Sequence, residues 1–362
     1  MSSLAEEIAN RYPATWLEIR AEQALLGALL LQPALITQVR GWLDPEDFFR
    51  PLHQDIYSAL LAHVDDLSDD PASPSLQQTV MAVWEQVRHT PDLTMLDVHD
   101  LITGCPTAAH ATTYAVMVVE ADIRRTVALH AARLAQALDQ RIQGGGTLES
   151  LFAAAETAKT IVARLGEKLR IPDLSSVQSP YLDDAVAVPI IPTPEEVDHQ
   201  DRLLTTLIAY PHQIDDVRPL LDDKDFTAPG RGQLFTVLTT MAGQGSAIDM
   251  ITVMWQAQRA GLLTPNEEGV QQFQQRFGDP AGESSLWLAQ QIQETSALAY
   301  ATTAAVRLKN AIGVADLHPR ELLALASREL NALTSRQPHH IQPTYQPPEA
   351  DGPIDQAHQQ RI

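Results

Sequence analysis

The sequence predicts an all-α protein with two tandem helical globules, each extended by a helical hairpin and joined by a proline-rich linker. Three observations favour this fold class. The 362 residues are 44% hydrophobic but only 5% aromatic, so the cores must consist mostly of Leu, Ala, Val and Ile, a mixture that favours helices. The apolar residues recur at helical spacing. One pattern of residues also occurs twice along the chain.

The internal repeat aligns residues 22–60 with residues 200–238 at a constant shift of 178 residues and without a gap. Identical residues occupy both apolar positions, which belong in a core, and turn positions. The pairs include Leu25 and Leu203, Pro33 and Pro211, Asp47 and Asp225, Phe48 and Phe226, and Leu60 and Leu238. Identity at both kinds of position indicates a duplicated domain.

The opening helix of the first globule is predicted by four leucines between residues 25 and 30, which share one helical face. Pro33 should end this helix, and a second helix should carry the apolar residues between 36 and 43. Asp44 suits an N-cap and Pro45 the first helical position of a short turn that Phe48 can anchor in the core. A further helix is expected around residues 56–61, followed by an acidic loop near 65–70.

The second part of each repeat predicts a helical hairpin. Residues 114–141 contain no Pro or Gly, three glycines at 144–146 force a turn, and a returning helix spans about 148–169. The second repeat shows the same pattern at a shift of 174 residues, with Gly313 opening the turn and Ala297 beginning the stripe. We interpret the apolar stripes as a candidate hairpin interface, formed by Ile123, Val127, Ala131, Leu134, Leu138, Ala301, Ala305, Leu308 and Ile312. Since exposed apolar stripes are unfavourable in water, we expect the two hairpins to pair within the chain. The alternative is that each hairpin pairs with another chain.

These patterns divide the chain into four parts. The first repeat is expected at residues 1–170 and the second, more divergent one at 198–335. Between them, residues 171–197 are rich in proline and contain no Lys or Arg, which predicts a flexible linker. Residues 336–362 are expected to form a disordered tail.

Candidate catalytic, cofactor and metal sites are not indicated. Cys105 is the single cysteine and has no nearby Cys-His signature, so a packed thiol is expected. His339 and His340 have no further ligands near them in the sequence. The glycine-rich turn at 144–146 lacks the Lys and Ser/Thr of a phosphate-binding loop.

The charge balance argues against direct nucleic-acid binding. The formal net charge is -21, whereas a protein that neutralises phosphates needs a basic surface. A local basic stripe could arise from four arginines of the first hairpin, but these are expected to face solvent or the rim: Arg124, Arg125, Arg133 and Arg141. No run of 18 apolar residues and no signal peptide is present, which predicts a cytoplasmic protein without membrane contact.

Several segments resemble the N-terminal domain of DnaB-type replicative helicases. Residues 22–30 (EQALLGALL) resemble its opening helix, and Asp47-Phe48-Phe49 with the segment 53–57 (HQDIY) resembles the signature that follows. In the second repeat, residues 249–253 (DMITV) resemble the middle of the domain, although Thr227 and Arg231 replace Phe49 and the histidine. The resemblance covers about residues 19–169 and, more weakly, 197–333.

The resemblance implies an all-helical globule plus a hairpin, which in the family forms the hexamer collar, pairs through the hairpins and contacts primase. The motor domain should follow, yet the 362 residues contain no Gly-x-x-x-x-Gly-Lys-Ser/Thr. We therefore expect no enzyme activity. The leading hypothesis is a replication accessory protein that docks on a replicative helicase, a primase or a loader. The alternative is a self-paired structural scaffold without replication partners.

Overall fold

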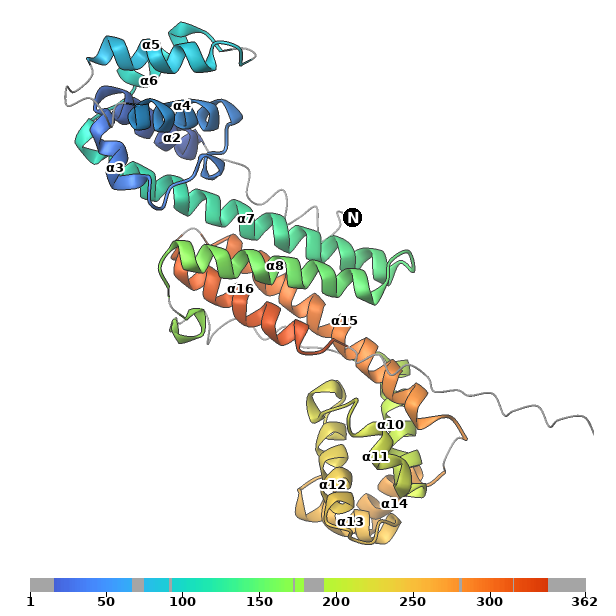
Figure 1. The fold of residues 1–362 in the computed structure, drawn as a ribbon. Helices are drawn as coiled ribbons and strands as arrows, with labels where there is room; N and C mark the ends of the chain where they lie inside the picture. The colour runs from blue at the N-terminus through green and yellow to red at the C-terminus, as the bar shows by residue number, and fades with distance from the viewer. Residues whose placement is uncertain are drawn as a thin grey trace, which may run out of the picture.

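The computed structural model describes residues 16–66, 75–90, 93–171, 173–178, 192–279, 282–314 and 316–337. The described residues are helical with connecting turns and contain no strand, which confirms the predicted all-α class. The molecule is elongated, with a helical globule at each end and two paired hairpins between them (Figure 1). The acidic loop residues Asp69 and Asp70 and the histidines of the tail lie outside the described residues.

Within the described residues, the first globule contains five α-helices and three short 3-10 turns. The α-helices are α2 (Trp16–Leu31), α3 (Ile36–Val39), α4 (Pro51–Asp66), α5 (Leu76–Val87) and α6 (Met95–Thr103). The 3-10 turns are η1 (Pro33–Leu35), η2 (Pro45–Asp47) and η4 (Ala108–His110). Helix α3 is a single turn that ends at Val39, so Leu43 lies beyond it, although Leu43 is still buried.

The second globule repeats this order. Its α-helices are α10 (Pro194–Ala209), α11 (Ile214–Val217), α12 (Arg231–Gly243), α13 (Met250–Arg259) and α14 (Glu267–Phe277). Its 3-10 turns are η6 (Pro211–Gln213) and η7 (Asp223–Asp225). The two hairpins are α7 (Ala111–Ile142) with α8 (Leu148–Lys168), and α15 (Ser285–Ile312) with α16 (Pro319–Thr334).

The helix boundaries follow local capping chemistry. Asp44 and Asp47 form a capping box around Pro45, as the sequence indicated for Asp44, and Phe48 is buried beside Tyr57. The opening helix of the first globule also makes a close approach to α6. A Cβ atom on Gly27 would lie 2.0 Å from the carbonyl oxygen of Leu101, so only glycine fits there.

The expected linker is partly structured. Pro194 occupies the first turn of α10 behind the N-cap Thr193, so residues 194–197 are helical and the flexible assignment was wrong for them. The physical reason is that a proline at the first helical position does not break a helix, because its missing N–H has no intrahelical acceptor there. At the other end, the 3-10 turn η5 (Leu174–Ser176) follows α8, and Leu174 packs against the hairpin core.

The long first helix of each hairpin belongs to two packing units. The N-terminal part of α7 packs against α2, and that of α15 packs against α10. The first globule therefore shares one continuous apolar core with both hairpins. The second globule has its own separate core, which includes Leu203, Phe235 and Leu288.

Buried charges attach the first globule to its hairpin. The Lys168 ammonium at the end of α8 lies 2.5 Å from a carboxylate oxygen of Asp47 and 2.8 Å from one of Asp44. On α7, the Arg125 guanidinium donates to the backbone oxygen of Asp47 at 2.6 Å. Asp122, one turn before Arg125, is also largely buried, and burial followed by repulsion from Asp47 raises the pKa of Asp122 to about 6.

The raised pKa of Asp122 predicts that its charge destabilises the fold at neutral pH. The charged form is present in the folded state above about pH 6, where its burial lowers the free energy of unfolding. This loss of stability shrinks as the pH drops towards the ordinary pKa of 3.8. We expect Asp122→Asn to raise the melting temperature by several degrees at pH 7.5 and the difference to shrink by pH 4, because a shift of two pKa units corresponds to about 3 kcal/mol. The exposed Asp100→Asn serves as the control. A D122N variant that melts lower than the parent at pH 7.5 would show that the carboxylate stabilises this junction.

Candidate interaction site

The two hairpins pack against each other as one four-helix bundle in the middle of the molecule. Helix α7 lies beside α15, and α8 lies beside α16 (Figure 1). The apolar side chains of all four helices join one buried cluster. Helices that place apolar residues at intervals of three and four positions form such a seam, because these residues fall on one face.

The structure places every residue of the candidate interface in this cluster. None of their side chains is more than 3% exposed. They are Ile123, Val127, Ala131, Leu134, Leu138, Ala301, Ala305, Leu308 and Ile312, together with Ala297. The seam is thus covered by the chain itself, and its use as an interaction site for another protein stays a prediction.

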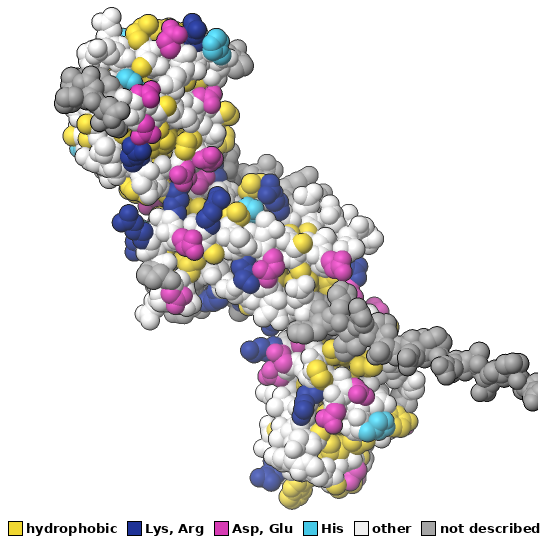
Figure 2. Space-filling model, in the orientation of Figure 1, with side chains coloured by type: hydrophobic (Ala, Val, Ile, Leu, Met, Phe, Trp, Pro, Cys, Tyr) yellow, Lys and Arg dark blue, Asp and Glu magenta, His cyan; other side chains and the backbone are white. Residues whose placement is uncertain are grey.

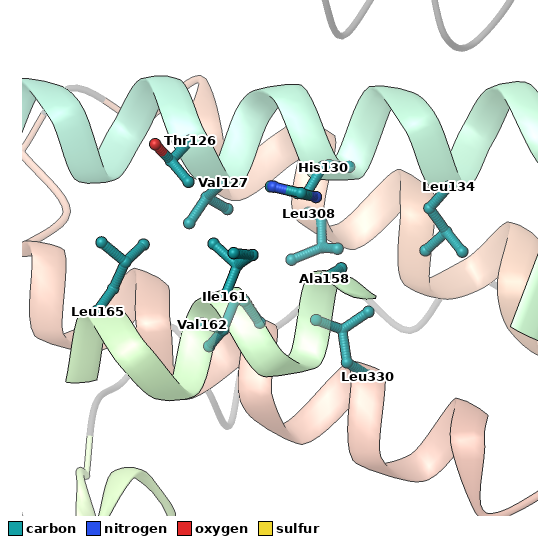
Figure 3. A pocket seen from close by; sticks show the side chains of 12 residues that line it. Thr126, Val127, His130, Leu134, Ala158, Ile161, Val162, Leu165, Leu308 and Leu330 are labelled. Atoms are coloured by element: carbon teal, nitrogen blue, oxygen red, sulfur yellow. The ribbon is translucent and has the colours of Figure 1, made fainter. Parts of the chain in front are cut away.

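The interior of the bundle is closely packed around His130. In Figure 3, Val127 of α7 points towards Val162 and Leu165 of α8, and Leu308 and Leu330 of the second hairpin line the same space. The space left between them is about 10 Å³, barely room for one water molecule. Burial, followed by the nearby Arg133, lowers the pKa of His130, so the imidazole is neutral in the folded chain at neutral pH.

Polar contacts join the hairpins across the seam. The Arg124 guanidinium donates to the backbone oxygens of Val314 and Leu317, in the turn between α15 and α16. Arg141 forms an ion pair with Glu294 of α15. These arginines were expected to face solvent or the rim. The expectation was wrong for Arg124 and Arg125, which donate to backbone oxygens within the chain, whereas the Arg141 side chain is 31% exposed, as a rim position implies.

The remaining arginine of the four, Arg133, is exposed. Arg125 is 14% exposed, approaches the carboxylates of Glu18 and Asp122, and lies 5.6 Å from the ring centre of Phe49. Three of the four guanidinium groups therefore hold the chain together, and they do not form the basic stripe that nucleic-acid binding would need.

Two buried clusters of ionisable side chains were missed by the sequence analysis. In the first globule, Glu22 lies 2.6 Å from His53 Nδ1 and accepts the backbone N–H of Phe49 at 2.5 Å. In the second repeat, Gln200 replaces Glu22 and accepts the backbone N–H of Ala228 at 3.1 Å. A comparison of the two repeats could have indicated this pair. At the shift of 178 residues, Gln200 stands in place of Glu22 and Arg231 in place of His53, so both members of the pair differ together.

The second missed group is Glu329 on α16, which is 1% exposed. Its carboxylate accepts hydrogen bonds from Arg307 at 3.1 Å and from the Tyr300 hydroxyl at 3.2 Å. Burial, followed by the charge of Glu329, raises the pKa of Tyr300 to about 12. This network lies within one hairpin and pairs the Glu329 carboxylate, although the buried Arg307 Nε has no hydrogen-bond partner, and it forms no open site.

The other candidates carry no reactive chemistry. Cys105 is a free, half-buried thiol whose pKa is raised by burial, which opposes the reactive thiolate form. In the α7–α8 turn, Gly144 has a φ of +77°, as a tight turn requires. Within the described ranges, no three His, Cys, Asp or Glu residues are grouped to hold a metal ion.

In the described part of the chain, no single helix is long and apolar enough to cross a membrane. Helix α2 and the segment 33–39 meet the criterion only as a pair bent by 117°, and most of α2 is buried in the first globule.

Comparison with known proteins identifies relatives of parts of this chain. The 33% identical replicative DNA helicase DnaB of Geobacillus stearothermophilus aligns over 133 residues, which cover 37% of this chain and 28% of the relative. The replicative DNA helicase DnaC of Bacillus subtilis is 35% identical over 33% of this chain and 25% of its own length. DnaB of Treponema pallidum is 27% identical over 52% of this chain and 43% of its own length.

The aligned regions thus span about a quarter to less than half of these relatives. No solved structure matches the chain. The model of the DnaB-like helicase N-terminal domain matches residues 17–120 and 193–278, which contain both globules and the beginning of α7. These matches cover more than half of the sequence, and the chain therefore belongs to the DnaB-like helicase N-terminal domain family.

Proposed function

We propose that this protein is a non-catalytic accessory of DNA replication that acts in the cytoplasm and docks on a replicative helicase, a primase or a helicase loader. The observation that carries this proposal is the family match in both repeats, since the relatives named above are replicative DNA helicases. The matched stretches belong to globules and not to a motor.

The arrangement of the hairpins supports docking through the globules. The candidate interface residues are buried within the bundle, so they are not available to a partner unless the bundle opens. The globules lie at opposite ends of the molecule, with α5 and α13 on their outer sides (Figure 1). One chain can therefore present two related surfaces at a fixed separation, as a linked pair of collar domains would.

Direct binding to purified replication proteins tests the proposal. The full chain, attached to a sensor surface, is exposed separately to the replicative helicase, the primase and the helicase loader of the same organism. We expect saturable binding of at least one of them at micromolar concentration or below. If a folded chain binds none of the three, the self-paired scaffold replaces the accessory function.

The absence of a phosphate-binding loop in the 362 residues predicts that the purified chain does not hydrolyse ATP. Release of phosphate should equal the rate of a protein-free blank, with or without single-stranded DNA. ATP turnover that follows the protein through successive columns at a constant specific activity would contradict this expectation.

The hairpin seam should be required for partner binding, because the bundle fixes the two globules relative to each other. Leu134→Asp places an unpaired carboxylate at a position that is 0% exposed, which should cost several kcal/mol of folding free energy. We expect a lower melting temperature and weaker partner binding. The matched control is Gln136→Asp, which adds the same charge at an exposed position of α7 and should leave both unchanged. If L134D changes neither stability, oligomeric state nor partner binding, the seam is not the interface that holds the hairpins together and supports partner binding.

A further inference from the structure

We propose that a cavity between the two repeats binds an acidic peptide segment of a partner protein, with an apolar side chain inserted into its floor. The cavity has a volume of about 330 Å³ and lies where the start of α7, the end of α8 and the start of α16 meet. It is separate from the buried seam. The proposal does not depend on the partner being a replication protein.

Both repeats contribute to this cavity. Trp42, together with residues of α7 and α8, comes from the first repeat, whereas His318, Pro319 and Arg320 come from the second. The cavity therefore exists only when the two hairpins are paired. A site of this kind is a property of the tandem chain and not of either repeat alone.

The floor of the cavity is apolar. Val116 and Val119 lie on one face of α7, and Trp42 and Leu169 complete the floor from two other segments. Val116 is 43% exposed, although the neighbouring Val119 is buried. An exposed apolar surface within a concave site favours a ligand that brings an apolar group of its own.

The rim of the cavity is cationic. Lys168, Arg170 and Arg320 line it, against the single carboxylate of Glu120. Lys168 is occupied by Asp44 and Asp47. Within the described residues, the side chains of Arg170 and Arg320 make neither a hydrogen bond nor an ion pair. Lys and Arg side chains also gather where the bundle meets the first globule in Figure 2.

Two unpaired guanidinium groups above an apolar floor match a peptide that carries carboxylates beside an apolar residue, because guanidinium binds carboxylate through paired hydrogen bonds. The net charge of -21 opposes long polyanions, so the site matches a short segment with few carboxylates and not the continuous phosphate backbone of a nucleic acid. The first backbone N–H of α16 is that of Arg320, because the helix begins at Pro319. This N–H already donates to His318 Nδ1, so it is not available to a bound carboxylate.

The backbone at Arg170 supports this assignment independently. Arg170 has a φ of +56°, the left-handed conformation, and is the single non-glycine residue with positive φ in the described part of the chain. It ends α8 in a Schellman-type motif, with its N–H bonded to the Glu167 oxygen and the Ile171 N–H bonded to the Gly166 oxygen. Glycine is the usual residue at this position, so an arginine there is strained. Residues with a strained backbone cluster at ligand-binding sites, which supports a binding role for this side chain.

A random library of 12-residue peptides displayed on phage tests the ligand class. After selection on the full chain, we expect enriched sequences that carry Asp or Glu beside an apolar residue. A synthetic, fluorescently labelled peptide from the selection should bind in an anisotropy titration, and replacing its acidic residues by their amides should weaken binding at least tenfold. A selection without acidic enrichment, or an amide peptide that binds equally well, would overturn the proposal.

Two variants locate the site. Arg170→Gly should weaken peptide binding at least tenfold while the melting temperature stays equal or rises, because glycine relieves the left-handed conformation. Arg320→Gln should weaken binding to a similar extent. The control combines Arg133→Gln and Arg164→Gln, which remove two exposed cations elsewhere on the first hairpin. If R170G and R320Q bind like the control, the peptide binds elsewhere and the cavity is not its site.

Discussion

The apolar contact between the two hairpins is the interaction on which the arrangement of the whole molecule depends. The second globule has a separate core and is attached to the rest of the chain chiefly through α15. Its position relative to the first globule is therefore set by how α15 and α16 pack on α7 and α8. Each fully buried leucine of the seam contributes about 2 kcal/mol relative to an exposed side chain. The summed free energy of these buried leucines is large enough to hold the four helices together without a covalent crosslink.

Local signals in the sequence predicted the opening helices of the globules and the helices of the hairpins, but not α5, α6, α13 and α14. Asp44 and Pro45 mark a capped turn by side-chain chemistry that operates within three residues, and the structure contains that turn. The stripe from Ile123 to Leu138 predicts one face of a long helix in the same way. Pro194 was misread, because a proline signals the start of a helix as readily as a break when a threonine and a glutamate flank it.

The polar contacts could not be predicted, because they join residues far apart in sequence and have no periodic signature. Arg124 donates to backbone oxygens about 190 positions away, and every residue type has such an oxygen. The Glu22–His53 pair could have been found by comparing the repeats, since both members change together. The cavity beside Arg170 depends on the positions of three helices and a loop residue, Trp42, which the sequence does not encode locally.

The Arg124 contact has a consequence for how the two halves can assemble. In the second repeat the corresponding position is Leu298, so the contact occurs once and has no symmetry mate. An isologous interface between identical chains would contain every contact twice. Two copies of the second hairpin would lack the arginine, because Leu298 stands at its position. The two hairpins are thus not interchangeable at this contact, which disfavours pairing of two second hairpins from neighbouring molecules.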